Sequence, residues 1–241
     1  MTGDRPLLGI VLPTRGVVLA GGDSPDAGLI VKMARLAEDA GVDSVWVGDS
    51  LVAKPRLEPL ATLAAVAVST SRVRLGTSVL LPALRHPVLL AQTAATVDQL
   101  SEGRLTLAMG VGGAFTDAQQ NEWATAGVEK RTRATRVEEI VEVMRGLWSG
   151  DPVTFHGKHF DFCDVSLGYR PYQRPGVPIL LGTHSGEGRD RQPARAARLS
   201  DGIISISDSP EEFASVRARV AEEAVAISRS PDELRSVYYM T

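Results

Sequence analysis

The sequence predicts an α/β fold built on a parallel sheet. Short apolar segments alternate with longer segments of helical periodicity, which is the pattern of strand–helix units. Such units join through right-handed crossovers, so their strands run parallel. Seven strands are predicted, which fits a barrel one unit short of eight or an open doubly wound sheet. The Pro-rich connector at residues 170–178 is short and lies inside the pattern. We therefore expect one domain over residues 1–241, with an eighth unit that is either outside this sequence or missing.

The first unit is predicted from turn and capping residues. A strand over Leu8–Leu12 ends at Pro13, and a loop with Gly21-Gly22 follows. A helix is expected to begin at Ser24-Pro25, a capping residue before a proline, and to end at Gly41. Its predicted buried face has apolar residues at helical spacing: Leu29, Met33, Leu36 and Ala40.

The next units follow at regular intervals up to residue 113. Their predicted elements are the strand Ser44–Val47, the helix Pro59–Ser69, the strand Val73–Leu80, the helix Pro87–Leu100 and the strand Leu105–Met109. This last strand leads into Gly110-Val-Gly-Gly113. Residues 114–132 are expected to form a polar connection without motifs, so the substrate is not predicted from them.

The second half of the chain begins with an amphipathic helix. Its apolar face consists of Val137, Ile140, Val141, Met144, Leu147 and Trp148, with Trp148 as a core residue. Residues 153–162 alternate around His156-Gly157-Lys158 and predict a hairpin. Three more strands are expected at residues 179–181, 202–206 and 235–240. The capping box Ser209-Pro-Glu-Glu212 predicts the start of a helix after the second of them.

The composition is that of a globular protein in a reducing compartment. The hydrophobic fraction is 44% and the charged fraction 23%. A net charge of -3 without basic runs argues against nucleic-acid binding. Cys163 is the single cysteine, so no internal disulfide is available. No apolar segment is long enough to span a bilayer and no signal segment is seen, so we expect a cytoplasmic protein.

Candidate site residues follow the predicted strands, because the carboxyl ends of parallel strands share one edge where α/β folds bind ligands. Thr77, Ser78 and Val79 lie in a tight turn with exposed backbone amides, which favours a flat, hydrogen-bonding ligand over a nucleophile. Asp49 follows the second strand, where it is either a functional carboxylate or a cap for the next segment. An ordinary bulge is the alternative for Ser78-Val79.

Other chemistries lack the residues they require. Schiff-base catalysis needs a lysine on a strand, and all four lysines fall on predicted helices or loops. A glycosidase needs two carboxylates at strand ends, and only Asp49 qualifies. Gly110-x-Gly112-Gly113 has the wrong spacing for a dinucleotide fingerprint. His156 and His159 have no carboxylate pair to complete a metal site, and His184 is either solvated or in contact with a ligand. A cofactor that brings its own reactivity explains this scarcity better.

Several motifs in order along the chain resemble the bacterial luciferase-like monooxygenase family. They are Arg85-His86-Pro87, Ala91-Gln92, residues 97–104, Gly110-Val-Gly-Gly113, Arg133, Glu138-Glu139, Met144, Leu147-Trp148, residues 177–182 and residues 196–202. The resemblance implies a TIM-type barrel and an oxidoreductase that uses the deazaflavin coenzyme F420 or, alternatively, FMN. It also implies a small organic substrate and a homodimer. The reaction would be hydride transfer with the deazaflavin or oxygen activation with FMN.

The resemblance assigns roles to the strand-end residues. It implies a cis peptide at Ser78-Val79 that supports the ring, with Thr77 beside it. Gly112 and Gly113 would lie along the cofactor, and Gly182, Thr183, Ser185 and Gly186 would hold its phosphate side. Asp49 would hydrogen-bond the ring or act as a base. Many deazaflavin members carry histidine after this aspartate, and Ser50 departs from that pattern.

Two other functions fit the predicted fold. One is a flavin-binding relative without catalytic activity, which a seven-stranded barrel would suit. The other is a phosphate-binding barrel enzyme of another class, such as an isomerase. Binding of F420 or FMN, followed by a turnover assay, separates the three. Arg131, Arg133 and Arg136 are expected on a solvated face or near a cofactor phosphate.

Overall fold

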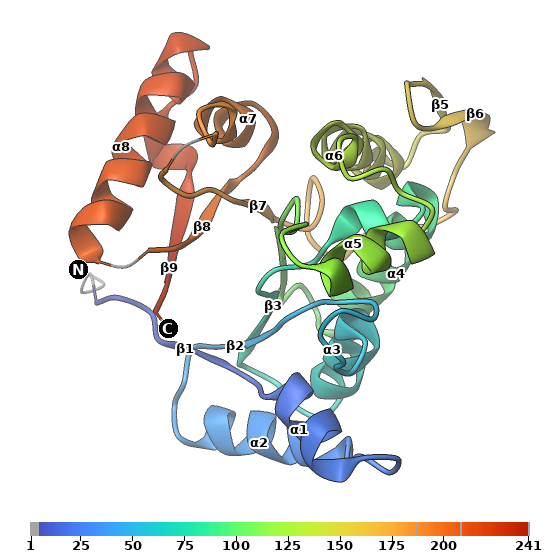
Figure 1. Ribbon diagram of the computed structural model, residues 1–241, viewed down its shortest axis with the longest axis vertical. Coiled ribbons are helices and arrows are strands. Elements are labelled where there is room, and N and C mark those ends of the chain that lie inside the picture. Colours follow the sequence, from blue (N-terminus) through green and yellow to red (C-terminus); the bar gives the residue numbers. More distant parts are fainter. Residues whose placement is uncertain (1–4, 187, 208, 241) are drawn as a thin grey trace.

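A seven-stranded parallel sheet forms the centre of the computed structural model, which describes residues 5–186, 188–207 and 209–240. Its strands, in spatial order, are β1 (Gly9–Val11), β2 (Ser44–Val47), β3 (Arg74–Thr77), β4 (Leu105–Met109), β7 (Ile179–Gly182), β8 (Gly202–Ile206) and β9 (Arg235–Tyr239). The sheet curls, so that β9 returns toward β1 (Figure 1). Within the described residues, β1 and β9 are its two edges. The predicted parallel sheet of seven strands is confirmed.

Six helices cover the convex face of the curl (Figure 1). They are α2 (Gly28–Asp39), α3 (Pro59–Ala67), α4 (Pro87–Leu100), α6 (Arg133–Ser149), α7 (Arg191–Leu199) and α8 (Pro210–Ala226). The main core lies between these helices and the sheet. The predicted apolar face of α6 is buried, and Trp148 donates its indole N–H to the Ala91 carbonyl at 3.1 Å.

The concave face of the sheet holds a small apolar cluster of its own. Ala108, Leu180 and Ile204 are at most 2% exposed and come from β4, β7 and β8. Val79 and Tyr239 pack against them from the turn after β3 and from the end of β9. The inside of the curl is therefore filled by side chains beneath the carboxyl ends of the strands.

The predicted first helix is wrong in its start and in its buried face. The helix α2 begins at Gly28 instead of Ser24, and its buried residues are Ile30, Ala34 and Ala37. Leu36, expected in the core, is 67% exposed. The small alanines let the helix axis approach the sheet closely, and this outweighs the burial of the larger leucines.

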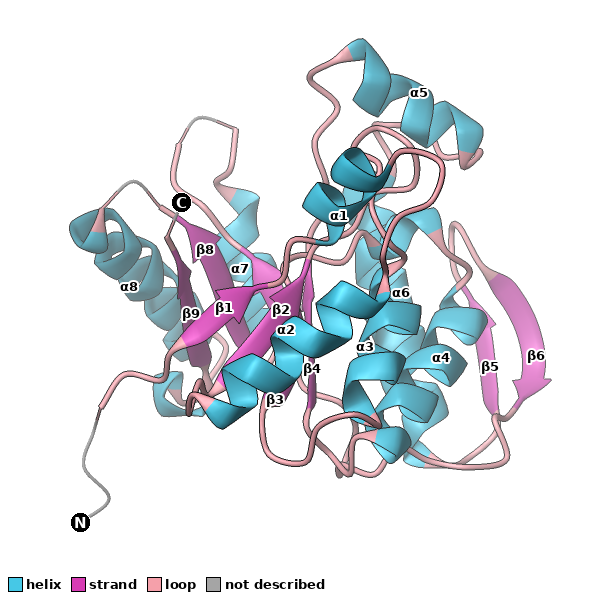
Figure 2. Cartoon of the chain, turned by 90° about the horizontal axis from the view of Figure 1, so that it is seen from below, coloured by secondary structure: helices cyan, strands magenta, loops and turns pink. Residues whose placement is uncertain are grey.

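Two short helices lie in segments that were predicted to be loops. α1 (Thr14–Gly21) follows β1 directly, and α5 (Asp117–Thr125) lies in the expected polar connection at 114–132. Both stand beyond the carboxyl ends of the strands (Figure 2). The start of α5 has a capping box in the sequence. The Thr116 hydroxyl accepts a hydrogen bond from the Gln119 backbone amide, and the Gln119 side-chain oxygen accepts one from the Thr116 backbone amide.

The other predicted elements agree with the structure. α4, β4 and β8 have the expected bounds, and Ser209 caps α8 by accepting from the Glu212 amide. The predicted hairpin is a separate two-stranded sheet of β5 (Val153–His156) and β6 (Asp161–Val165). α7 had not been predicted as a helix. Short 3-10 turns lie at Pro82–Leu84 and Pro231–Glu233. No helix in the described part of the chain is long and apolar enough to cross a membrane.

Candidate functional site

The candidate site is the edge formed by the carboxyl ends of β2, β3, β4 and β7. The predicted site residues follow these four strands directly, so the parallel topology brings them to one edge. α1 and α5 flank the same edge (Figure 2). Each candidate site segment therefore begins at the end of a strand and continues into a loop or a short helix.

The turn after β3 contains a cis peptide bond between Ser78 and Val79, as the resemblance implies. Ser78 N–H donates to the Val47 carbonyl at 2.7 Å, and the buried Thr77 donates its hydroxyl to the Ala108 carbonyl at 2.8 Å. The turn is thus tied to both neighbouring strands. The Ser78 hydroxyl oxygen is buried and has no hydrogen-bond partner within the described residues. It is a buried polar atom at the candidate site.

Asp49 is engaged by three donors after β2. Its carboxylate accepts from both terminal nitrogens of Arg85, at 2.6 and 3.1 Å, and from the Leu81 amide at 2.9 Å. Arg85 also pairs with Glu58 at 2.9 Å. Burial lowers the pKa of Arg85, but the bonds to Asp49 and Glu58 outweigh it and leave that pKa raised. Arg85 therefore fixes the Asp49 carboxylate, a role that the sequence did not reveal.

Ser50, in the position of the family's histidine, faces a buried carboxylate. Its hydroxyl donates to Glu122 at 2.6 Å, and the amides of Val52 and Ala53 donate to the same oxygen at 2.9 and 3.1 Å. Burial raises the pKa of Glu122, but these hydrogen bonds outweigh it and hold that pKa below its usual range. Glu122 on α5 thus anchors the loop that follows β2.

The glycine loop after β4 is held by residues from α5 and α6. Trp123 donates its indole N–H to the Gly113 carbonyl at 2.8 Å, and Arg133 donates to the Gly112 carbonyl. The Arg133 guanidinium carbon lies 5.2 Å from the centre of the Trp123 ring. Gly112 has a φ of 78°, and a Cβ there would lie 2.7 Å from the Trp123 ring. Only glycine meets both conditions.

The loop after β7 contains the predicted phosphate-side residues. Thr183 is buried and donates its hydroxyl to the Leu181 carbonyl at 3.2 Å. The Ser185 hydroxyl donates to Glu212 on α8, and its carbonyl accepts from Arg189 at 2.8 Å. The side chain and the carbonyl of Ser185 are therefore both engaged within the protein.

His184 lies in the same loop and is half buried. Its amide donates to the Gln192 side chain at 2.9 Å, and a Cβ built on Gly182 would lie 3.9 Å from its Nε2. Burial, then the nearby charge of Arg189, lowers the pKa of His184. Burial and Arg189 therefore disfavour the charged form of the imidazole.

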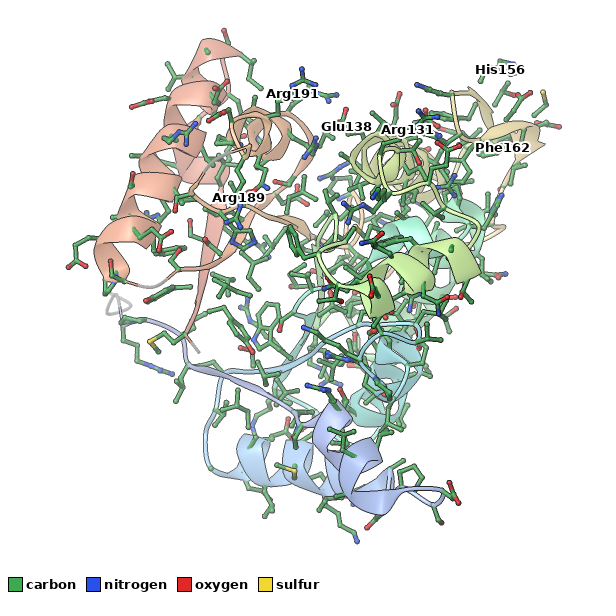
Figure 3. The ribbon with its side chains drawn as sticks, viewed as in Figure 1. Arg131, Glu138, His156, Phe162, Arg189 and Arg191 are labelled. Atoms are coloured by element: carbon green, nitrogen blue, oxygen red, sulfur yellow. The ribbon has the colours of Figure 1, made fainter. Side chains whose placement is uncertain are left out.

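The arginines near the start of α6 and α7 divide into exposed and engaged groups. Figure 3 shows Arg131 near α6 and Arg191 at the start of α7. Glu138 of α6 bonds Arg195 and Arg198 of α7 at 2.7 and 2.8 Å. Arg133 is hydrogen-bonded to the Gly112 carbonyl. The predicted solvated face of Arg131, Arg133 and Arg136 therefore does not include Arg133. In the described residues, no group of three or more His, Cys, Asp or Glu side chains forms a metal site.

Four supporting residues were missed by the sequence reasoning. They are Glu58, Glu122, Trp123 and Arg56, the last of which lies in the segment after β2. Arg85 was singled out only as part of the family motif Arg85-His86-Pro87. Of these positions, only those on α5 had a local signal, the capping box at Thr116. The other contacts join residues far apart in the chain.

The comparisons with known proteins identify one family. A family model described as luciferase-like monooxygenase matches residues 7–241. An F420-dependent glucose-6-phosphate dehydrogenase from Amycolatopsis mediterranei is 35% identical over 187 residues, which cover 74% of this chain and 53% of that protein. One of the same name from Nocardia farcinica is 38% identical over 189 residues, with coverages of 74% and 53%. The chain spans about half the length of these relatives.

Solved structures show the same fold. A monooxygenase from Streptomyces bottropensis superimposes with a TM-score of 0.78 at 27% identity, over 98% of this chain and 70% of that one. A coenzyme F420 dependent tetrahydromethanopterin reductase from Methanopyrus kandleri superimposes with a TM-score of 0.77 at 24% identity, over 97% and 65% of the two chains. The curled sheet is therefore shared with enzymes of different reactions.

Proposed function

The chain belongs to the luciferase-like monooxygenase family, and from that premise we propose that it is an oxidoreductase that binds coenzyme F420 at the carboxyl edge of its sheet. The curated relatives named above are F420-dependent enzymes, which favours the deazaflavin over FMN. The observation that carries the proposal is the placement of Ser78, Val79 and Gly112 at one strand-end edge of the sheet, with a Ser78 hydroxyl that has no partner in the described residues. We also propose that the curled sheet is the larger part of a TIM-type barrel.

The residues at the edge fit a planar ring. Val79 packs on the apolar cluster of Ala108, Leu180 and Ile204, so it presents a supported, apolar surface. The buried Ser78 hydroxyl supplies a donor or acceptor that lacks a partner in the described residues. Gly112 and Gly113, fixed by Trp123 and Arg133, would let the backbone approach the ring from the β4 side.

The phosphate side of the cofactor would meet the loop after β7. We assign it to Gly182, Thr183, Ser185 and Gly186, whose backbone lies just before α7 (Arg191–Leu199). Arg189, which holds the Ser185 carbonyl, adds positive charge there. The Ser185 hydroxyl is taken by Glu212, so we expect its contribution to come from the main chain.

In the proposed reaction, Asp49 and Ser50 would hold the site in shape. The deazaflavin, when bound, supplies hydride transfer at C5, whereas reduced FMN supplies oxygen activation. Asp49, with Arg85 and the Leu81 amide on its oxygens, would fix the turn beneath the ring. The Ser50 hydroxyl is bonded to Glu122, so Ser50 does not replace the family histidine as a proton relay. The substrate is expected to be a small organic molecule, and glucose 6-phosphate is the first to assay.

A titration of the purified protein with F420 and with FMN tests the proposal. We expect saturable F420 binding, seen by absorbance or fluorescence, and cofactor reduction with an oxidisable substrate. S78A should weaken F420 binding and leave the free energy of unfolding nearly unchanged, because the hydroxyl has no partner among the described residues. S101A is the matched control. It removes a buried hydroxyl bonded to Asp98 and Arg104, so it should lower stability without changing F420 affinity.

Each other outcome would favour a different function. Binding without turnover over a panel of alcohols, aldehydes and sugar phosphates would favour a flavin-binding relative that has lost catalysis. Binding of a sugar phosphate with no affinity for either cofactor would favour a barrel enzyme of another class. An S78A variant that binds F420 as tightly as the wild type would remove the ring from this turn.

A further inference from the structure

Arg56 places a cation directly against the candidate site. It lies between β2 and α3, and its side chain turns back over the end of β2. A Cβ built on Gly48 would lie 1.9 Å from Arg56 Nη1 and 3.6 Å from the Ser78 carbonyl oxygen. The guanidinium thus points its Nη1 at Gly48, close to the Ser78 carbonyl. A side chain at position 48 would displace it.

The guanidinium of Arg56 has donors without acceptors. Its Nε donates to the Lys54 carbonyl at 3.2 Å, and no bond or ion pair of its Nη atoms is seen within the described residues. The nearest carboxylates are occupied, since Asp49 is bonded to Arg85, and Glu122 to Ser50 and two amides. A half-buried guanidinium normally finds an anionic partner.

A second cation increases the need for an anion. Arg15, exposed on α1, has no ion pair within the residues that the structure describes. Burial lowers the pKa of Arg56, the charges of Asp49, Glu122 and Tyr239 raise it, and that of Arg15 lowers it. The two arginines therefore repel each other.

We propose that Arg56, seated on Gly48 with Arg15 nearby, is a binding residue for an anionic oxygen group of a ligand at this site, a phosphate or a carboxylate. The inference rests on the proposed function and adds a charge requirement to it. The group belongs either to the substrate or to the cofactor, and both present the same chemistry to a guanidinium. Arginine's planar donors suit such oxygens better than a lysine ammonium does.

Four variants test the role of Arg56. R56M keeps much of the side-chain volume and removes the charge, and R56K keeps the charge but loses the planar donors. G48A leaves Arg56 in the sequence and displaces its guanidinium. R217M, an exposed arginine on the outer side of α8, is the matched control. Urea unfolding of each variant identifies any general loss of fold.

Two titrations distinguish the source of the anion. Inorganic phosphate is titrated into the free protein by calorimetry, and F420 is titrated by fluorescence. We expect R56M to weaken one of these by at least about tenfold, which corresponds to the loss of one charge-assisted hydrogen bond. G48A should reproduce most of that loss, R56K part of it and R217M none. Weakened phosphate binding with unchanged F420 binding points to the substrate, and weakened F420 binding, with or without a loss of phosphate binding, points to the cofactor.

Unchanged affinity of R56M for both probes would overturn the inference, as would wild-type protein that binds neither. The proposed function fails separately. Wild-type protein that does not bind F420 but loses phosphate binding in R56M would keep the anion site and reject the F420 proposal.

Discussion

Replacing Arg85 with methionine tests whether the Asp49–Arg85 pair stabilises the ligand-binding edge. The Asp49 side chain is 1% exposed and that of Arg85 20% exposed. Breaking a buried pair costs about 3–5 kcal/mol, because one charge stays buried without its partner. The Leu81 amide still bonds Asp49 in the variant. We therefore expect R85M to lower the free energy of unfolding by about 3 kcal/mol, the lower end of that range, and Tm by about 6–12 °C.

The chain contains a matched pair at its surface. Arg5 bonds Asp43 through both terminal nitrogens at 3.0 and 2.8 Å, and the Leu8 amide bonds the same carboxylate at 2.8 Å. The donors are the same as at Asp49, but Arg5 is 66% exposed. Because water screens exposed pairs, R5M should lower stability much less than R85M does. Urea unfolding of both variants, followed by circular dichroism, gives their free energies of unfolding. The difference between them shows how burial changes the contribution of an ion pair with the same set of donors.

A double-mutant cycle completes the test. D49N removes the charge that R85M leaves unpaired, so the D49N/R85M variant should lose less stability than the sum of the two single losses. The F420 affinity of R85M should fall as well, because Asp49 holds the Leu81 amide next to the cis peptide. Equal losses for R5M and R85M, or additive losses in the cycle, would refute the reasoning.

Three further predictions concern the loops around the site. E122Q should lower the free energy of unfolding by about 1–3 kcal/mol, since three donors lose a charged acceptor. The lowered pKa of Glu122 means that its stabilisation is lost as pH falls below about 4, so unfolding of E122Q should depend less on pH in that range; an unchanged pH profile would contradict this. The pKa of His184, lowered by burial and then by Arg189, should be seen by NMR below the ordinary value of about 6.5. As the pH falls, the histidine of the unfolded chain is protonated before that of the folded protein. The free energy of unfolding therefore falls as the pH drops below the ordinary pKa, and H184Q should remove this contribution to the pH dependence of stability. A His184 pKa at or above the ordinary value would count against its burial. G112A should cost about 1–3 kcal/mol for its left-handed backbone plus a penalty for crowding Trp123, whereas G127A, with a φ of 66° and open space around it, isolates the backbone part. Equal losses in G112A and G127A, measured by urea unfolding, would show that Trp123 moves aside freely.

The strands and most helices were predictable because their signals are local. β4, β8 and α4 have the expected bounds, since each is a run of apolar or periodic residues between clear breakers. The predicted face of α2 failed because periodicity identifies two apolar faces there, and only packing against the sheet decides between leucines and the smaller Ala34 and Ala37. α1 and α5, of eight and nine residues, are too short for periodicity to separate them from loops.

The candidate site divides in the same way. Residues directly after strands, such as Asp49 and Ser78, were predictable because a parallel sheet carries all its strand ends to one edge. Their partners were not, since Arg85 lies 36 residues from Asp49 and Glu122 lies 72 residues from Ser50. Such contacts depend on the path of loops, which neither periodicity nor propensity determines.

The undetected partners also change what the predicted residues are able to do. An aspartate at a strand end predicts a base or a ligand-binding carboxylate, but one with a guanidinium and an amide on its oxygens is instead a fixed anion. Among the described residues, Arg56, which no motif indicates, carries a positive charge at the edge without an ion pair. The sequence predicts which residues share the candidate edge, because topology brings the strand ends together. The charge of the ligand follows from which side chains remain without partners once the loops have folded.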